Sequence, residues 1–229
     1  MIFLDWLDHI ETGTGSTMNI LHLSCSPRGQ AAESYRLART IVDCLLKDEP
    51  EAIVVDRSLG EGGISHVDGN YAMAQHDAAA QTNQVGTVSR SEVLIRELED
   101  SDVLVIGTPM HNLSVPSALK AWIDHVVRAR RTFDVTSAGK VGLLSDRPVF
   151  IAIASGGVFL GARARQPDFL TPYLKVVLGT IGLRDLRFFS VEGTGRGPEA
   201  VSEARAGAER ALQEHFSSTG FGTRSLCAH

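Results

Sequence analysis

The sequence predicts an α/β protein whose parallel sheet is covered by helices on both faces. Short apolar runs rich in Val and Ile alternate along the chain with longer segments of helical spacing. One of these runs, residues 103–106, has no polar face, which is typical of a strand buried on both sides in a parallel sheet. At 229 residues the chain suits one α/β domain with a substantial core.

The most informative unit is strand, loop and helix over residues 102–124. Pro109 removes a backbone donor soon after the strand, so the chain leaves the sheet there. Pro116 suits the first turn of the helix that follows, with Ser114 as a candidate cap. One apolar helix face is predicted from the spacing of Leu119, Trp122, Ile123 and Val126. The loop therefore lies at the carboxyl end of a parallel strand, where open α/β sheets bind ligands.

The remaining elements follow in order around this unit. Further strands are predicted at residues 19–24, 53–55, 149–154 and 186–191. Helices are predicted at residues 32–47, 88–99, 171–181 and 198–216. Residues 57–86 have no sustained period, which favours a surface excursion with one short helix, and residues 128–142 are predicted to be an irregular connection. The domain is predicted to span residues 18–217, between a non-essential extension (1–17) and a loose tail (218–229).

Composition narrows the classes of function. A net charge of −5 argues against general affinity for nucleic acid, which needs a basic surface. No apolar run reaches membrane-spanning length, and residues 1–17 contain no Lys or Arg, so neither a membrane protein nor a secreted one is expected. The three cysteines have no metal-ligand spacing, which favours reduced thiols in the cytoplasm and no metal site.

Three loops must open at one edge of the predicted sheet. The first, residues 24–34, carries Ser26 and Ser34 ahead of a helix, and could form a phosphate cradle or be a simple turn with capping residues. The third-strand loop offers backbone amides from residues 110–113 between apolar walls. The fourth-strand loop has Gly156 and Gly157, which permit close approach to a flat ligand or form an ordinary turn.

Several other chemistries are excluded by the motifs. The first loop is neither an ATPase loop nor a glycine fingerprint for a dinucleotide. A Cys-x5-Arg phosphatase pattern fails because position 31 is alanine, so Cys25 is predicted to be a small turn residue rather than a nucleophile. His22 is predicted to be a packed strand residue rather than a ligand. A bound cofactor is then the economical source of chemistry.

Together the motifs resemble one known family. A strand followed by two spaced serines, Thr-Pro-Met-His-Asn (108–112) ahead of a Pro-x-x-Leu-Lys-x-Trp-x-Asp helix, and a strand followed by Gly-Gly are similar to FMN-dependent NADH azoreductases and NAD(P)H quinone reductases of the flavodoxin-like superfamily. Phe-Leu-Thr-Pro-Tyr-Leu (169–174), Leu-Gly-x-Ile-Gly (178–182) and Glu-Gly-x-x-x-Gly-Pro-Glu (192–199) match in the same order, over residues 19–217.

The resemblance implies a doubly wound five-stranded sheet of order 2-1-3-4-5, with FMN in a cleft at the interface of a homodimer. It implies that electrons pass from NADH or NADPH through FMN to a quinone or azo compound in two half-reactions. A flavodoxin-type electron carrier, a general NAD(P)H:FMN reductase and a flavin-free binding module remain alternatives. Apolar residues on two helices also favour a dimer, namely Trp122, Val126, Tyr173 and Val177.

By position, the resemblance assigns each loop a part of the cofactor. Ser26 and Ser34 correspond to phosphate-binding serines. The loop along the isoalloxazine corresponds to Pro109, Met110, His111, Asn112 and Leu113, and the pyrimidine edge to Ala154, Ser155, Gly156 and Gly157. His111 stands where the family often has Tyr, and is either a proton donor to the acceptor or a wall of the site.

Two further features raise questions of charge. Glu33 stands where the family often has an uncharged residue, and would oppose a phosphate unless it points away or caps the helix. Arg128, Arg130 and Arg131 either attract nucleotide phosphates or form a solvated, positively charged helix end.

Overall fold

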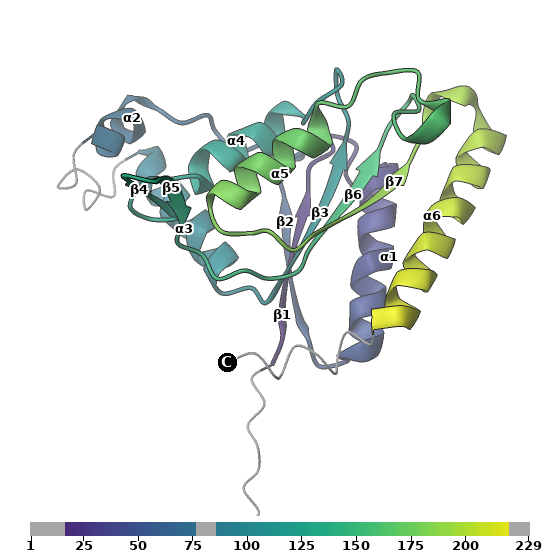
Figure 1. The fold of residues 1–229 in the computed structure, drawn as a ribbon, viewed down its shortest axis with the longest axis horizontal. Helices are drawn as coiled ribbons and strands as arrows, with labels where there is room; N and C mark the ends of the chain where they lie inside the picture. Colours follow the sequence, from purple (N-terminus) through teal and green to yellow (C-terminus); the bar gives the residue numbers. More distant parts are fainter. Residues whose placement is uncertain (1–16, 77–85, 220–229) are drawn as a thin grey trace, which may run out of the picture.

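The computed structural model describes residues 17–76 and 86–219, and its centre is a five-stranded parallel sheet (Figure 1). The strands run in the order β2-β1-β3-β6-β7. This is the predicted order 2-1-3-4-5, because β6 and β7 are the fourth and fifth strands of this sheet. The strands are β1 (Asn19–Ser24), β2 (Ile53–Ser58), β3 (Val103–Pro109), β6 (Val149–Ala154) and β7 (Leu186–Val191).

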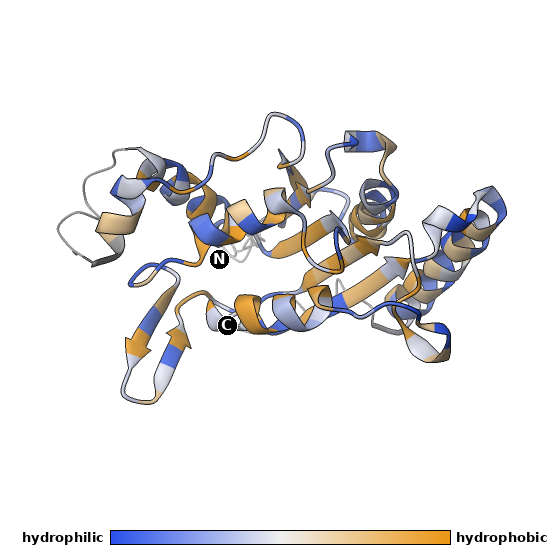
Figure 2. Cartoon of the chain, turned by 90° about the horizontal axis from the view of Figure 1, so that it is seen from above, coloured by the Kyte–Doolittle hydropathy of each residue, from blue (hydrophilic) through white to orange (hydrophobic). Residues whose placement is uncertain are grey.

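Helices cover both faces of the sheet, as Figure 1 shows. They are α1 (Glu33–Asp48), α2 (Gly69–His76), α3 (Thr87–Glu99), α4 (Ser117–Val126), α5 (Leu170–Thr180) and α6 (Pro198–Thr219). Side chains alternate along each strand, so Ile20 packs in the core under α1 and α6, whereas Leu21 packs in the core under α3, α4 and α5. The apolar strands therefore lie between two helical layers (Figure 2).

The strand ends define one edge for the predicted loops. Ser24 of β1 pairs with Gly107 of β3, and Pro109 of β3 pairs with Ala154 of β6. Because these strands are parallel and in register, the loops that follow them emerge side by side. The first turn of α1 packs directly on β3, since a side chain at Gly107 would collide with the Ser34 carbonyl and the Ala38 methyl group.

The irregular connection predicted at residues 128–142 is wrong. The structure has an antiparallel hairpin there, made of β4 (Phe133–Thr136) and β5 (Gly139–Gly142). Each strand is only four residues long, which is too short for a detectable alternation. The hairpin extends away from the sheet (Figure 2), so it lacks the apolar run of a buried strand.

Smaller differences concern the ends of elements. β2 continues to Ser58, and α6 continues three residues past position 216 to Thr219. Pro116 precedes α4 instead of starting it, and no side chain caps that helix, so Ser114 is not its cap. The extension at residues 1–16 and the tail at residues 220–229 lie outside the described residues. Among the helices that the structure describes, none has both the length and the hydrophobicity that a membrane crossing requires.

Candidate functional site

The first loop joins β1 to α1 and has the character of an anion site. Ser34 lies in the first turn of α1 with 1% of its surface exposed, and its Oγ has no hydrogen-bond partner among the described residues. A buried hydroxyl without a partner is unfavourable in an empty fold and favourable beside a ligand oxygen. The backbone N–H groups of the same turn also lack helical acceptors and carry the positive end of the helix dipole.

The second predicted serine is arranged differently. Ser26 is also buried, and its Oγ accepts a hydrogen bond from the Arg28 backbone N–H at 3.2 Å. Its hydroxyl hydrogen can still be donated, because the bond to Arg28 uses only a lone pair. Gly29 follows with a φ of +51°, so the loop turns through a conformation that favours glycine. Ser26 and Ser34 thus both keep a hydroxyl hydrogen that can be donated to a phosphate.

Glu33 does not oppose an anion at this site. Its carboxylate accepts hydrogen bonds from Nε and Nη2 of Arg205 on α6, at 2.7 and 2.5 Å. The hydrogen bond from Arg205 lowers the pKa of Glu33, so the carboxylate is charged and directed toward α6. The sequence left two arrangements in which Glu33 would not oppose a phosphate, pointing away from it or capping the helix. In the structure, Glu33 points away.

The third-strand loop is a tight turn fixed at both ends. His111 and Ser114 exchange two backbone hydrogen bonds of 3.0 Å, and the residues between them, Asn112 and Leu113, have φ of 48° and 70°. Two consecutive positive φ angles are typical of a type I′ turn, in which leucine is strained. Met110 donates its N–H to the Ala154 carbonyl at 2.8 Å, which joins this loop to the fourth strand.

Only part of the predicted row of amides is available in this loop. The N–H groups of Met110 and His111 already have backbone acceptors. Among the described residues, those of Asn112 and Leu113 have none, so they are the donors left for a ligand. The His111 side chain is exposed to solvent, and Met110 is 9% exposed.

The fourth-strand loop is attached to the loop that follows β7. Ser155 donates its N–H to the Val191 carbonyl at 3.0 Å, and its own carbonyl accepts from Thr194. The carbonyls of Gly156 and Gly157 accept from Gly195 and Gly193. Within the part of the chain that the structure describes, the Gly156 and Gly157 N–H groups have no acceptor. They are therefore available at the rim of the site.

Sequence reasoning missed Gln166, which lies between these two loops. Its Nε2 is 3.0 Å from Ser155 Oγ and 3.1 Å from Met110 Sδ. No periodicity or motif distinguishes a glutamine in an irregular segment, so the sequence carried no signal for it.

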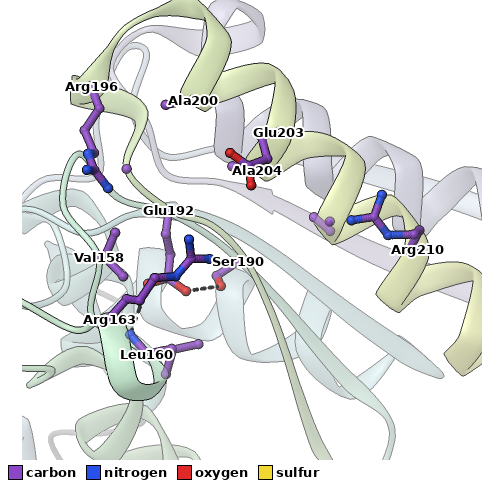
Figure 3. Close-up of a pocket in the computed structure, with 13 residues that line it drawn as sticks. Val158, Leu160, Arg163, Ser190, Glu192, Arg196, Ala200, Glu203, Ala204 and Arg210 are labelled. Atoms are coloured by element: carbon purple, nitrogen blue, oxygen red, sulfur yellow. Dashed lines mark hydrogen bonds between the residues drawn. The ribbon is translucent and has the colours of Figure 1, made fainter.

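A cleft of about 300 Å³ lies beside the predicted site and contains none of its residues. It is bounded by the segment after β6 and by α6, and Arg163, Arg196 and Arg210 line it (Figure 3). Glu192 accepts hydrogen bonds from the Phe159 and Leu160 N–H groups and from the Ser190 hydroxyl. Its carboxylate thereby holds the chain that follows the fourth-strand loop.

Two of the three arginines after α4, Arg128 and Arg131, serve the fold. Arg128 is 3% exposed and donates to Ser91 Oγ at 2.9 Å and to Glu92 at 2.8 Å, while Arg131 donates to Glu92 and Glu99. Burial of the Glu92 carboxyl would raise its pKa, but hydrogen bonds from Arg131 and Arg128 outweigh burial and lower that pKa. Neither expectation for Arg128 and Arg131 is therefore correct, because these two side chains join α4 to α3.

Cys25 and His22, which the sequence excluded as a nucleophile and as a ligand, are both buried in the structure. Cys25 lies in the core, where burial raises the pKa of its thiol, so no nucleophilic thiolate forms near neutrality. His22 is 1% exposed, and its Nδ1 lies 2.6 Å from the Asp56 carboxylate. It is a packed strand residue, as predicted.

Comparison with known proteins identifies the family to which this architecture belongs. A family model described as the flavodoxin-like fold matches residues 18–216. The chain is 46% identical over 187 residues to FMN-dependent NADH:quinone oxidoreductase 5 of Burkholderia lata, covering 82% of this chain and 91% of that protein. It is 46% identical over 194 residues to FMN-dependent NADH:quinone oxidoreductase 4 of Pseudomonas fluorescens, covering 85% and 93%.

Solved structures agree with this fold. An azoreductase from Bacillus anthracis superposes with a TM-score of 0.75 at 24% identity, covering 86% of this chain and 98% of that one. An FMN-dependent NADH-azoreductase from the same species, solved in complex with FMN, gives 0.69 at 21% identity, covering 86% and 99%. With a family match over nearly the whole described domain and curated relatives at 46% identity, the chain belongs to the flavodoxin-like fold family, among the FMN-dependent NADH:quinone oxidoreductases.

Proposed function

We propose that this protein is an FMN-dependent oxidoreductase that reduces quinones or azo compounds with NADH. The observation that carries the proposal is the buried Ser34 hydroxyl, which has no partner among the described residues and lies at a helix start where three loops converge. The relatives that match most of this chain are named as FMN-dependent NADH:quinone oxidoreductases. FMN carries the single terminal phosphate that such a loop suits.

Each loop holds one part of FMN in this proposal. Ser26, Ser34 and the first amides of α1 bind the phosphate. Residues 109–113 lie along the isoalloxazine, with the Asn112 amide near its reactive nitrogen. Residues 154–157 border the pyrimidine edge. When bound, FMN accepts an electron pair from NADH and passes it to the quinone or azo compound.

The protein's own contribution is position and electrostatics. The hydrogen-bonded turn from His111 to Ser114 fixes where the amides of Asn112 and Leu113 point. The N–H groups of Gly156 and Gly157 stabilise negative charge at the pyrimidine edge, because fixed donors need no reorganisation during the reaction. His111, exposed at the rim, contacts the acceptor as a wall or as a proton donor. No protein nucleophile is required.

The cofactor assignment has a direct test. Purified protein should show a flavin spectrum, and the released cofactor should have the mass of FMN; the mass of FAD, or no flavin, would refute it. Turnover should then be measured with NADH and NADPH against a panel of quinones and azo dyes. Parallel double-reciprocal plots would support two half-reactions. A flavodoxin-type carrier would bind FMN without multiple turnover, and a general flavin reductase would need added flavin.

We also propose that the active unit is a homodimer, although not through all the residues first expected. Trp122 and Val126 are fully buried within the subunit, so they are wrong as interface residues. Val176 on α5 is 71% exposed, and Val135 on the hairpin is 65% exposed. These elements are neighbours, because the Leu144 N–H donates to the Ile181 carbonyl beyond α5.

Exposed valines on neighbouring elements suit contact with a second copy. Val176→Glu should give monomers in light scattering at micromolar concentration, whereas Val93→Glu, at an exposed valine on α3, should not. Wild-type protein that is monomeric with full activity would refute the dimer.

The described cysteines, Cys25 and Cys44, are free thiols, which supports our proposal of a cytoplasmic location.

A further inference from the structure

Gln166 connects the two loops that border the predicted ring site. Its carboxamide nitrogen donates to Ser155 Oγ at 3.0 Å and lies 3.1 Å from Met110 Sδ. Met110 belongs to the third-strand loop and Ser155 to the fourth-strand loop, and both side chains are at least nine-tenths buried. One side chain therefore contacts both loops from a third segment.

The carboxamide is held in place by its surroundings. A Cβ atom at Gly157 would collide with Gln166 Oε1, so the absence of a side chain at Gly157 makes the room for Gln166. The segment that carries Gln166 is anchored as well. The Phe169 N–H donates to the Leu113 carbonyl at 3.1 Å, and Asp168 accepts from the Leu170 and Thr171 N–H groups at 2.9 Å.

The direction of these hydrogen bonds decides what Ser155 can do. The amide nitrogen of Gln166 can only donate, so Ser155 Oγ accepts from it. The Ser155 hydroxyl hydrogen is then left to be donated. Met110 Sδ, at 3.9 Å, is a weak acceptor for it. A ligand oxygen or nitrogen at this rim would be a stronger acceptor.

We infer that Gln166 is a positioning residue, whose carboxamide orients the Ser155 hydroxyl as a donor to the pyrimidine edge of FMN. This inference rests on the proposed function. Negative charge collects at that edge when FMN is reduced, so a fixed donor there stabilises reduced FMN more than oxidised FMN. Gln166 thereby raises the reduction potential of the bound cofactor without touching the substrate.

The test compares two variants of nearly the same size. In Gln166→Glu, studied near pH 8 where a carboxylate is ionised, the side chain accepts the Ser155 hydrogen and adds negative charge. Reduced FMN should bind about tenfold more weakly relative to oxidised FMN, a fall of about 30 mV in the two-electron potential. Gln166→Met should lower the potential by less. The matched control is Arg165→Gln, because the Arg165 side chain donates a hydrogen bond to the adjacent Ala164 carbonyl, and its backbone bond to Val158 is kept.

The measurements are the potential, by equilibration with a reference dye, and the dissociation constant of oxidised FMN. The Ser155→Ala background should abolish most of the effect of Gln166→Met, which acts through the Ser155 hydroxyl, whereas the added charge of Gln166→Glu acts in either background. A potential unchanged in both Gln166 variants, or equal weakening of both redox forms, would overturn the inference. Wild-type protein that binds no FMN would instead refute the proposed function.

Discussion

The molecule contains two polar regions of opposite character, one at the start of α1 and one between α3 and α4. At the start of α1, the buried hydroxyl of Ser34 has no partner among the described residues. Between α3 and α4, Glu92 accepts hydrogen bonds from both Arg128 and Arg131. A buried hydroxyl without a partner is tolerated where a ligand completes it, whereas a carboxylate held between two guanidinium groups belongs to the fold. Substitutions should therefore change binding in the first region and stability in the second.

The largest expected effect is on the ionic cluster. Glu92→Ala leaves the Arg128 guanidinium buried without its carboxylate, and should lower the free energy of unfolding by about 3–5 kcal/mol. Denaturant titration measures this, and FMN affinity of the folded fraction should not change. The control is Arg96→Ala, which removes an exposed pair with the same carboxylate and should cost less than about 0.5 kcal/mol. Equal losses in the two variants would contradict the comparison.

Ser34→Ala should have the reverse pattern. In the proposed site it removes a charge-assisted hydrogen bond to the phosphate, worth about 1.5–3 kcal/mol, so FMN should bind roughly 10- to 150-fold more weakly in a flavin-fluorescence titration. The cofactor-free protein should be as stable as wild type or slightly more so, because a buried hydroxyl without a partner is removed. Thr40→Ala, at a half-buried position further along the same helix, is the control. Unchanged FMN affinity would remove Ser34 from the site.

Acid should weaken the fold through buried histidines such as His22. Burial lowers the pKa of His22 below its usual 6.5, although the hydrogen bond and charge of Asp56 oppose this and Arg39 supports it. Between the lowered value and 6.5, the unfolded chain binds more protons, so stability is present above 6.5 and is lost as the pH falls. Denaturant titrations between about pH 7.5 and 5.5 should show this loss. The slope should be shallower in His22→Leu; an unchanged slope would exclude His22.

Arg205→Ala should have a smaller effect on binding. It releases the Glu33 carboxylate beside the phosphate site, and should weaken FMN binding about two- to fivefold, as expected for a partly solvent-screened charge. Adding Glu33→Gln to this variant should restore wild-type affinity. A double variant as weak as Arg205→Ala would show that Arg205 acts through helix packing instead of charge.

The smallest effect is expected at His111. Its side chain is exposed, so water can supply the proton that a quinone takes up. Pre-reduced His111→Phe and His111→Gln enzymes should reduce a quinone within about twofold of the wild-type rate at all pH values, since general acids contribute at least ~10²-fold where they act. Slowing by that factor in both variants, with loss of the pH dependence near neutrality, would make His111 the acid.

The sequence predicted those elements whose physics is local. The strands β1, β6 and β7 match the predicted residues, because each is a short segment rich in apolar residues between polar turns. The edge at which the loops lie followed from the alternation of strands and helices along the chain. The loops that follow parallel strands all leave the sheet at the same edge. The β4–β5 hairpin did not follow, because four-residue strands outside the core have no periodic signal.

The sequence predicted which loops form the candidate site, but not which distant side chains contact one another there. Arg205 lies 172 residues from Glu33, so no local pattern could show that this carboxylate is neutralised. Gln166 lies 56 residues from Met110, and only the folded chain brings them together. Arg128 and Arg131 were misread for the same reason, since their glutamates lie on α3. The placement of FMN on these residues remains a prediction.

The left-handed turn at Leu113 has a consequence for protein engineering. A leucine at a φ of 70° is strained by roughly 1–2 kcal/mol, and Gly or Asn there would relieve the strain. A search for thermostable variants would therefore select this position early. The same change would keep the turn, because type I′ turns favour Asn-Gly, but it would remove the apolar Leu113 side chain from the third-strand loop. Selection for heat resistance alone would thus remove the apolar side chain that this loop would present to a flat ligand in the proposed site.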